Sequence, residues 1–248
     1  MNNAYGPGRT ALVTGGSRGI GAAVAERLAE DGMDVAITYV SDAGAAGRVV
    51  AAVEARGRRA VALRADAGDA AEVANAVGET VRRFGRLDVL VNNAGVGAVG
   101  PLEAVGVAEV ERVLGVNVRG AFLAAQAAAA RMREGGRIIT VGSCMTQRVP
   151  GPGGVLYATS KAATIGLTKA LARELGGRGI TANLVHPGPV DTDMNPADGP
   201  YAGPQAAMTA LGRFGTPSEV ADVVSFLAGP GAGWVTGAEF AVDGGHAA

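Results

Sequence analysis

Seven short runs rich in Val, Ile and Leu recur along this chain, separated by segments long enough to form helices. Apolar runs alternating with helical segments are typical of a parallel sheet whose two faces are both covered. We expect strands at residues 11–14, 35–39, 60–64, 87–91, 137–141, 181–185 and 239–242. With six helical segments between them, the sequence predicts a single doubly wound α/β domain with a seven-stranded parallel sheet flanked by helices.

The chain length of 248 residues suits one such domain, with two small domains as the alternative. No Pro-rich or charged linker divides the chain. We therefore expect a mobile tail at residues 1–8 and one Rossmann domain at 9–248. Within it, Pro and Gly interrupt residues 187–215 too often for one continuous helix. Residues 189–212 are therefore interpreted as a substrate lid, and a passive surface loop is the alternative.

Charge and composition exclude several partners. The 22 basic and 23 acidic residues nearly cancel and form no basic run, so nucleic acid is not expected. The longest apolar stretch, residues 121–130, is well short of the roughly 18 residues that a membrane span needs. The single Cys144 and the absence of an N-terminal apolar segment favour a cytoplasmic protein. His186 and His246 are too few and too isolated to predict a metal site.

The segment at residues 116–133 is predicted to be a helix that is rich in Ala nearly all round. Small apolar residues on more than one face indicate burial on more than one side, so we expect an oligomer interface there. The alternative is that Ala serves only as a helix former, which leaves the scarcity of charges unexplained.

A glycine-rich loop follows the first expected strand and precedes a helical segment. Its sequence is Thr14-Gly15-Gly16-Ser17-Arg18-Gly19-Ile20-Gly21. Glycines allow a backbone to approach a pyrophosphate, whose charge the N-terminus of the helix then meets. The loop predicts a dinucleotide site. Its candidate residues are Gly15, Ser17, Arg18, Gly19, Ile20 and Gly21.

The residues after the second strand bear on which dinucleotide binds. An NAD-binding protein normally has an acid there that holds the ribose 2′-hydroxyl, but this chain has Tyr39-Val40-Ser41. Since Arg18 could also pair with a 2′-phosphate, we favour NADP(H) over NAD(H). A merely solvated Arg18 would remove most of that preference. Asp66, just after the third strand, could accept a hydrogen bond from adenine, or could simply be a turn residue.

Polar residues also follow the fourth and fifth strands. Asn92-Asn93-Ala94-Gly95 ends one strand and Ser143 follows the other, at the edge of the sheet where ligands bind in open α/β folds. Further along, Tyr157 and Lys161 are four residues apart at the start of an expected helix, so they share one face. A nearby cation should lower the pKa of a Tyr hydroxyl and make it usable for proton transfer.

These motifs together resemble the short-chain dehydrogenase/reductase family, in particular its 3-oxoacyl-[acyl-carrier-protein] reductase-like branch. The resemblance extends from Thr10 to Gly245. It rests on the glycine loop, the Asn92-Asn93-Ala94-Gly95 turn, Asn117, Ser143, and the Tyr157 and Lys161 pair. Pro187-Gly188-Pro189-Val190-Asp191-Thr192 and Val242-Asp243-Gly244-Gly245 also match.

The resemblance implies a role for each matching residue. Tyr157 would donate a proton to a ketone oxygen that Ser143 also binds. Lys161 would hold the nicotinamide ribose and lower the Tyr157 pKa, while Asn117 would fix a water molecule. The further cofactor contacts would come from Asn93, Ala94, Gly95, Pro187, Gly188, Val190 and Thr192.

The function implied is NADPH-dependent reduction of a ketone, either a 3-oxoacyl compound or a small carbonyl compound, by a homotetramer. Two alternatives are an NAD(P)-dependent alcohol dehydrogenase working in the oxidative direction and a non-catalytic protein that senses a nucleotide. Residues 144–153, between Ser143 and the Tyr157 helix, should form one wall of the substrate pocket.

Overall fold

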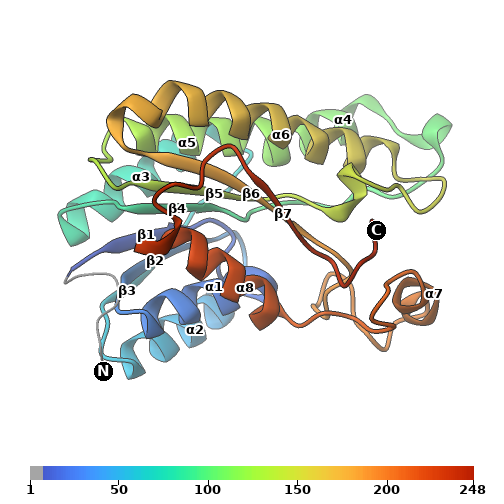
Figure 1. The fold of residues 1–248 in the computed structure, drawn as a ribbon, viewed down its shortest axis with the longest axis horizontal. Coiled ribbons are helices and arrows are strands. Elements are labelled where there is room, and N and C mark those ends of the chain that lie inside the picture. Colours follow the sequence, from blue (N-terminus) through green and yellow to red (C-terminus); the bar gives the residue numbers. More distant parts are fainter. Residues whose placement is uncertain (1–7) are drawn as a thin grey trace.

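The computed structural model describes residues 8–248, so residues 1–7 of the expected tail lie outside the described residues. Seven strands form one sheet in the order β3-β2-β1-β4-β5-β6-β7, and all neighbours run parallel (Figure 1). The strands are β1 (Thr10–Val13), β2 (Asp34–Tyr39), β3 (Ala60–Arg64), β4 (Val89–Asn92), β5 (Arg137–Val141), β6 (Thr181–Pro187) and β7 (Glu239–Val242). The predicted seven-stranded parallel sheet is confirmed.

Several strands differ from their predicted bounds by one or two residues, and β4 and β6 extend past their predicted ends because a neighbouring strand pairs with them. Asn92 belongs to β4, since it pairs with Thr140 of β5. Pro187 belongs to β6, since it pairs with Val242 of β7. Apolar character alone does not reveal these ends, because polar and Pro residues stand there.

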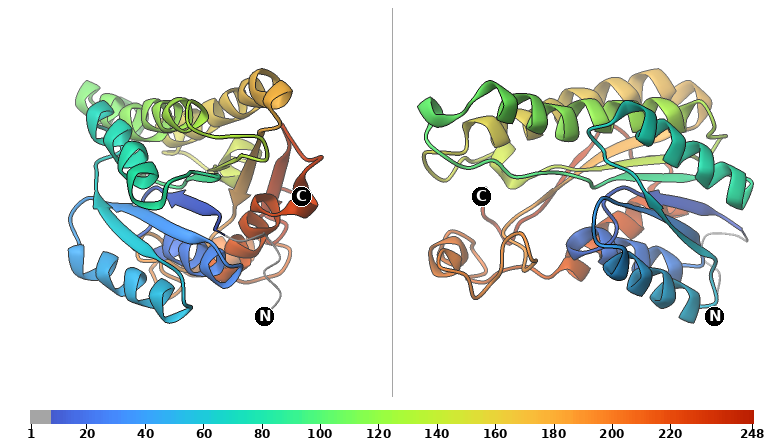
Figure 2. Two further views of the ribbon diagram at one scale, coloured as in Figure 1. Left: turned by 90° about the vertical axis from the view of Figure 1, so that its left-hand side faces the viewer. Right: turned by 180° about the vertical axis from the view of Figure 1, so that it is seen from behind.

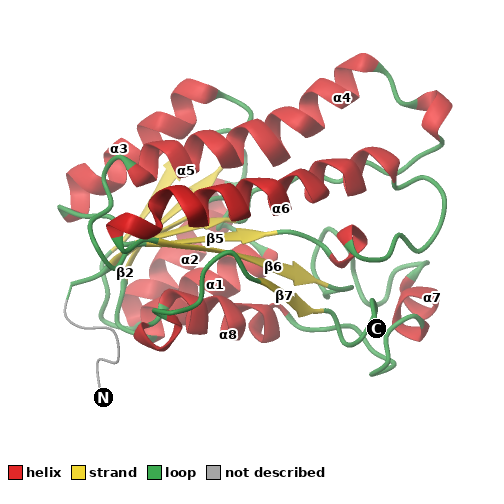
Figure 3. Cartoon of the chain, turned by 45° about the horizontal axis from the view of Figure 1, so that its top comes forward, coloured by secondary structure: helices red, strands yellow, loops and turns green. Residues whose placement is uncertain are grey.

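Helices cover both faces of the sheet (Figures 1 and 2). On one face lie α1 (Gly19–Glu30), α2 (Ala43–Ala55) and α8 (Pro217–Ala228). On the other lie α3 (Ala70–Phe84), α4 (Val107–Leu114), α5 (Ala121–Ala129) and α6 (Val155–Leu175), as Figure 3 also shows. Each layer buries its own apolar cluster against the sheet, including Leu28 and Val224 on the first face and Leu90 and Leu175 on the second.

A π-helical turn, Gly115–Gly120, joins α4 to α5. The helix predicted at residues 116–133 is therefore divided into this π-helical turn and α5, and it ends earlier, at Ala129. Its Ala residues pack against both β4 and α3 of the same chain, so α3 covers the second buried side. Wide turns of this kind are frequent at functional sites, and this one carries the buried Asn117.

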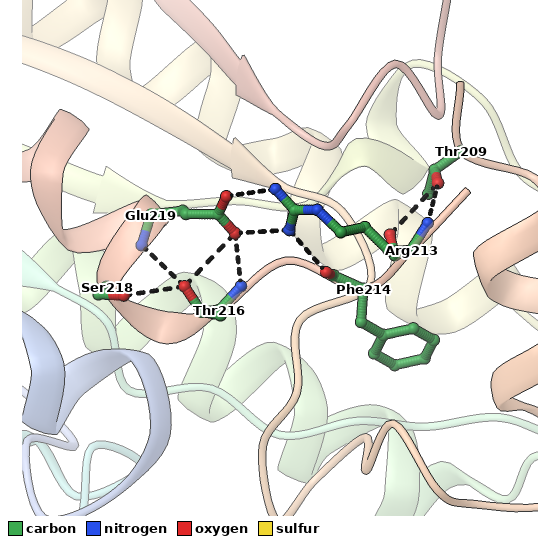
Figure 4. Close-up of polar contacts among 6 residues, drawn as sticks. All are labelled: Thr209, Arg213, Phe214, Thr216, Ser218 and Glu219. Atoms are coloured by element: carbon green, nitrogen blue, oxygen red, sulfur yellow. Dashed lines mark hydrogen bonds and ion pairs between the residues drawn. The ribbon is translucent and has the colours of Figure 1, made fainter. Parts of the chain in front are cut away.

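The segment between β6 and α8 contains the short helix α7 (Ala202–Ala207) and is fixed to α8 at its end (Figure 4). The Thr216 hydroxyl accepts a hydrogen bond from the Glu219 N–H, and the Glu219 carboxylate accepts one from the Thr216 N–H. Arg213 also binds this carboxylate, and its hydrogen bond lowers the Glu219 pKa to about 2. Arg213 is tied back through its N–H to the Thr209 hydroxyl. The expected lid thus ends at a rigid helix cap.

No helix within residues 8–248 combines the length and apolar character that crossing a membrane would require.

Candidate active site

A hydrogen-bonded clasp joins the ends of β1 and β4. The Thr14 hydroxyl accepts hydrogen bonds from the N–H groups of Asn93 and Ala94, at 3.1 and 3.0 Å. The Asn93 side-chain amide donates to the carbonyls of Thr14 and Gly15, each at 3.0 Å. The Gly15 N–H donates in turn to the Thr38 hydroxyl of β2, at 2.9 Å. The glycine loop is therefore held by three strands at once.

The glycine loop packs closely against the Asn93 turn and leads into α1. A Cβ atom at Gly21 would collide with the Asn93 side-chain amide and the Gly15 carbonyl, so this position tolerates only glycine. Helix α1 begins at Gly19 with no acidic residue in its first turn, and Arg18 provides no side-chain cap. The first N–H groups of α1 are thus available to an anion.

A pocket lies beside this loop, between the ends of β1 and β4 and helices α3 and α5. It is lined by small and apolar groups from all four elements, together with a few polar side chains. The lining residues are Leu12, Thr14, Thr38, Ala65, Ala67, Val73, Ala76, Val77, Asn92, Ala94, Val116, Gly120, Ala121 and Ala124. Asp66, next to this pocket, is exposed. Its carboxylate accepts a hydrogen bond from the Gly68 N–H and so stabilises the turn after β3, as in the predicted alternative of a turn residue.

Two cations lie near the site proposed for the ribose. Arg18 is 66% exposed and its Nη1 lies 3.9 Å from the Asp193 carboxylate. Arg64, the last residue of β3, pairs with Tyr39 across the sheet and donates from Nε to the Val40 carbonyl. Ser41 is exposed just beyond. Arg64 was missed by sequence reasoning because only the register of β2 and β3 brings it beside Tyr39.

The Lys161 side chain enters the sheet edge from α6. It is buried, and its Nζ donates to the Val141 carbonyl at the end of β5, at 2.9 Å. The same ammonium lies 5.8 Å from the centre of the Tyr157 ring. A Cβ at Gly95 would stand 3.3 Å from this Nζ and 3.4 Å from Asn117 Oδ1. Residues from four separate elements thus converge on one point.

The pKa values of these groups follow from burial. Burial lowers the Lys161 pKa to about 8, because the charged ammonium is taken out of water. Burial also raises the Tyr157 pKa, and a hydrogen bond with the Ser143 side chain opposes that effect. Desolvation of the phenol is thus the largest effect on the Tyr157 pKa, and the expected lowering by Lys161 stays a prediction.

Asn117 connects the π-helical turn to the Tyr157 helix. Its side-chain amide donates to the Val96 carbonyl and to the Ser160 hydroxyl, and its Oδ1 accepts from the Val96 N–H. The Ser160 hydroxyl donates to the Tyr157 carbonyl, at 2.8 Å. Ser160 gave no motif signal, yet it is fully buried and links Asn117 to the turn of α6 that carries Tyr157.

The chain after β6 returns to the glycine loop. The Gly188 N–H donates to the Val242 carbonyl of β7, which continues the pairing begun at Pro187. Val190 is buried and bridges to Gly215. Thr192 lies against the start of α1, because a Cβ at Gly19 would stand 3.2 Å from its methyl group. These predicted cofactor residues therefore reach the same edge of the sheet as the glycine loop.

Comparison with known proteins agrees with this geometry. The family model described as "Enoyl-(Acyl carrier protein) reductase" matches residues 15–247. A cyclic-di-GMP-binding biofilm dispersal mediator protein of Escherichia coli K12 is 43% identical, and 96% of each chain is covered. A 3-oxoacyl-[acyl-carrier-protein] reductase of Synechocystis is 41% identical, again over 96% of each. A short chain dehydrogenase of Burkholderia cenocepacia, solved in complex with NADP, is 52% identical with a TM-score of 0.96, covering 98% of this chain and 99% of that one.

The chain belongs to the short-chain dehydrogenase/reductase family. Its place in the 3-oxoacyl-[acyl-carrier-protein] reductase-like branch, predicted from the motifs, is confirmed as well.

The residues of this short-chain dehydrogenase/reductase fit a dinucleotide. The first N–H groups of α1 suit a pyrophosphate. Because Gly21 has no side chain, the glycine loop and the Asn93 turn can pack closely at this point. Ala67 and Val116 present small apolar surfaces in the narrow pocket beside the loop. Lys161 reaches the same edge of the sheet at the end of β5.

The surroundings of Cys144 disfavour the reactive form of its thiol. Burial raises the pKa of its thiol to about 11, and the thiolate is the reactive form. The side chain is also only 5% exposed.

Replacing Gly21 tests whether close packing of the glycine loop is needed for dinucleotide binding. We expect Gly21→Ala to weaken NADPH binding at least tenfold, because the added methyl must push Asn93 or Gly15 out of the clasp. The measurement is titration with NADPH, followed by its fluorescence. Gly47→Ala on α2 is the matched control, since its Cβ would meet nothing within 4 Å. Equal NADPH affinities in the two variants would contradict a role of this close packing in NADPH binding.

Proposed function

We propose that this protein uses NADPH to reduce a ketone to a secondary alcohol. The observation that carries the proposal is the convergence of Ser143, Tyr157 and Lys161 at the sheet edge, with Lys161 Nζ buried 5.8 Å from the Tyr157 ring. A protein that only binds a nucleotide has no need for a half-buried phenol beside a buried ammonium. Related proteins named as reductases of 3-oxoacyl groups support the same reaction class.

In this proposal the protein positions the ketone and supplies a proton. Tyr157 keeps its proton at neutral pH, because burial raises its pKa, and donates it to the ketone oxygen. Ser143 binds the same oxygen and orients it toward Tyr157. Lys161 holds the ribose hydroxyls, and Asn117 keeps the π-helical turn against α6. The bound NADPH supplies the hydride.

The walls of the substrate site are proposed to be residues 144–153 and the lid at 189–212. Both segments carry exposed apolar side chains, including Val149 at 51%, Met194 at 61% and Tyr201 at 73%. Large apolar groups left open to water at the mouth of a site are suited to an apolar substrate. We therefore expect ketones with an apolar chain or ring to be preferred over small polar ones.

A second candidate function is binding of a cyclic dinucleotide without turnover. It is favoured by one relative, since the Escherichia coli protein is described as binding cyclic-di-GMP. The glycine loop and the free end of α1 would also receive the phosphates of such a ligand. Titration with cyclic-di-GMP in the presence and absence of NADPH would distinguish a competitor at this site from a ligand bound elsewhere.

Loss of the Tyr157 hydroxyl tests the catalytic proposal. We expect Tyr157→Phe to lower kcat for ketone reduction by at least about 100-fold, because general acid catalysis contributes roughly that much. NADPH oxidation at 340 nm is followed with a panel of ketones, and alcohols with NADP+ test the reverse direction. Thr159→Ala, which removes an exposed hydroxyl from the same helix, is the control.

Unchanged NADPH affinity in Tyr157→Phe would show that the variant is folded. Equal rates in Tyr157→Phe and the parent, or no rate in either, would refute the reductase as proposed. Turnover only from alcohols would assign the oxidative direction instead.

Arg18 is proposed to select NADPH over NADH. Its pairing with Asp193 is long and exposed, so little free energy holds it away from a 2′-phosphate. We expect Arg18→Ala to weaken NADPH binding about tenfold and NADH binding by less than threefold. Both affinities are measured by fluorescence titration, with Arg82→Ala on α3 as an exposed control. An equal loss for both cofactors would show that Arg18 does not contact the 2′-phosphate.

A cytoplasmic homotetramer is proposed as the working form. The first half of α6 exposes small uncharged residues, Ala162, Ala163 and Gly166, and Phe122 of α5 is 51% exposed. At the other end Trp234 is 98% exposed, just before β7. Apolar surfaces of this kind are typical of interfaces between copies of a chain.

Light scattering at micromolar concentration tests the assembly. We expect a mass near four times 24.5 kDa. Ala163→Arg should reduce that mass, because a buried unpaired charge opposes association, whereas Ala51→Arg on the outer face of α2 should not. A monomeric parent would contradict the proposal.

A further inference from the structure

A buried histidine lies directly behind Ser143. His186, on β6, has no exposed surface, and its Nδ1 is 3.3 Å from the Ser143 nitrogen and 3.0 Å from the Ser143 carbonyl oxygen. The Thr146 hydroxyl lies 3.2 Å from the same Nδ1 and donates to the Ser143 carbonyl at 2.9 Å. One ring nitrogen therefore faces both main-chain polar groups of a proposed active-site residue.

The other ring nitrogen is anchored from the surface. His186 Nε2 lies 3.1 Å from the Glu239 carboxylate on β7, and Lys169 Nζ on α6 lies 2.8 Å from the other carboxylate oxygen. The Lys169 hydrogen bond lowers the Glu239 pKa, so the carboxylate is ionised and can only accept. His186 Nε2 must therefore carry a proton that it donates to Glu239.

The proton on Nε2 decides what Nδ1 can do. In the neutral ring Nδ1 has no hydrogen and accepts the hydrogen bond from the Ser143 N–H. In the doubly protonated ring Nδ1 donates to the Ser143 carbonyl instead. In both states His186 holds the main chain of Ser143.

The ring also fits its place closely. A Cβ at Gly142 would stand 2.7 Å from His186 Nδ1, so the strand end passes directly over the ring. The Gly142 N–H donates to the Val185 carbonyl at 2.7 Å, which keeps β5 and β6 together up to this point. Beyond it, pairing of the two strands stops, and His186 provides the next contact to Ser143.

We propose that His186 is a positioning residue for the reduction, fixing Ser143 and the Cys144–Thr146 turn through Nδ1 while Glu239 and Lys169 fix the ring through Nε2. The inference rests on the proposed reductase function, because Ser143 must contact the ketone oxygen for its position to affect turnover. Small displacements of a group that contacts the reacting atoms can cost up to about 100-fold in rate.

Two substitutions separate the two ends of the ring. In His186→Asn the side-chain amide occupies the place of Nδ1 and can still reach Ser143, whereas in His186→Gln it extends toward Glu239 instead. We expect His186→Gln to lower kcat at least tenfold with little change in KM, and His186→Asn to retain kcat within about threefold of the parent. A purely structural role would affect the two variants according to their stability rather than in this order.

Asn183→Ser is the control on the same strand. Asn183 is buried and joins β6 to the segment before β7, through bonds to the Val235 carbonyl and the Ala238 N–H, without touching Ser143. The Asn183→Ser substitution should lower the melting temperature and leave kcat unchanged. Equal kcat values in the two His186 variants, or a parallel loss of NADPH affinity and kcat in His186→Gln, would overturn the inference.

A spectroscopic measurement tests the ring without turnover. The chain contains only two His residues, so the imidazole 15N signals of the full-length protein can be assigned by comparison with His186→Asn. We expect His186 Nε2 to carry a proton in the parent at neutral pH, and Glu239→Gln to change its signal. An Nε2 without a proton would overturn the inference, even if no ketone substrate is found. No turnover by the parent, together with a protonated Nε2, would instead refute the proposed function alone.

Discussion

The clasp between Thr14 and Asn93 is the interaction on which the site depends. It forms between β1 and β4, where the order of the strands reverses and a crevice opens at their carboxyl ends. The Thr14 hydroxyl receives the Asn93 and Ala94 N–H groups, so the glycine loop and the Asn turn cannot move separately. A ligand bound by the loop is thereby placed at a fixed height above β4 and β5.

Burial of the Lys161 ammonium, at the part of the site near Tyr157, destabilises the folded protein. A lysine whose pKa falls from 10.5 to about 8 opposes folding at neutral pH by on the order of 3 kcal/mol, since the unfolded chain binds the proton more tightly. The opposition fades as the pH rises from the folded pKa of about 8 to the unfolded pKa of 10.5. The rest of the fold must therefore hold the ammonium in place against the Val141 carbonyl.

The sequence predicted the seven strands, the helices that alternate with them along the chain, and the shared helix face of Tyr157 and Lys161, because these depend on local periodicity. Positions four apart on a helix share a face wherever the helix packs. It did not predict the raised Tyr157 pKa, which depends on burial by distant segments. Ser160 and Arg64 also escaped prediction, since their partners become neighbours only through helix packing and strand register.

The two sides of the site are formed by different kinds of structural element. The proposed cofactor side consists of strand ends and backbone contacts, in which a single methyl group at Gly21 has no room. The proposed substrate side consists of loops, and one of them, residues 144–153, is held to the loop after β4 by the hydrogen bond from the Gly100 N–H to the Gly153 carbonyl. Because exposed side chains such as Val149 and Tyr201 can change there without disturbing the sheet, substrate preference can vary while the cofactor site is retained.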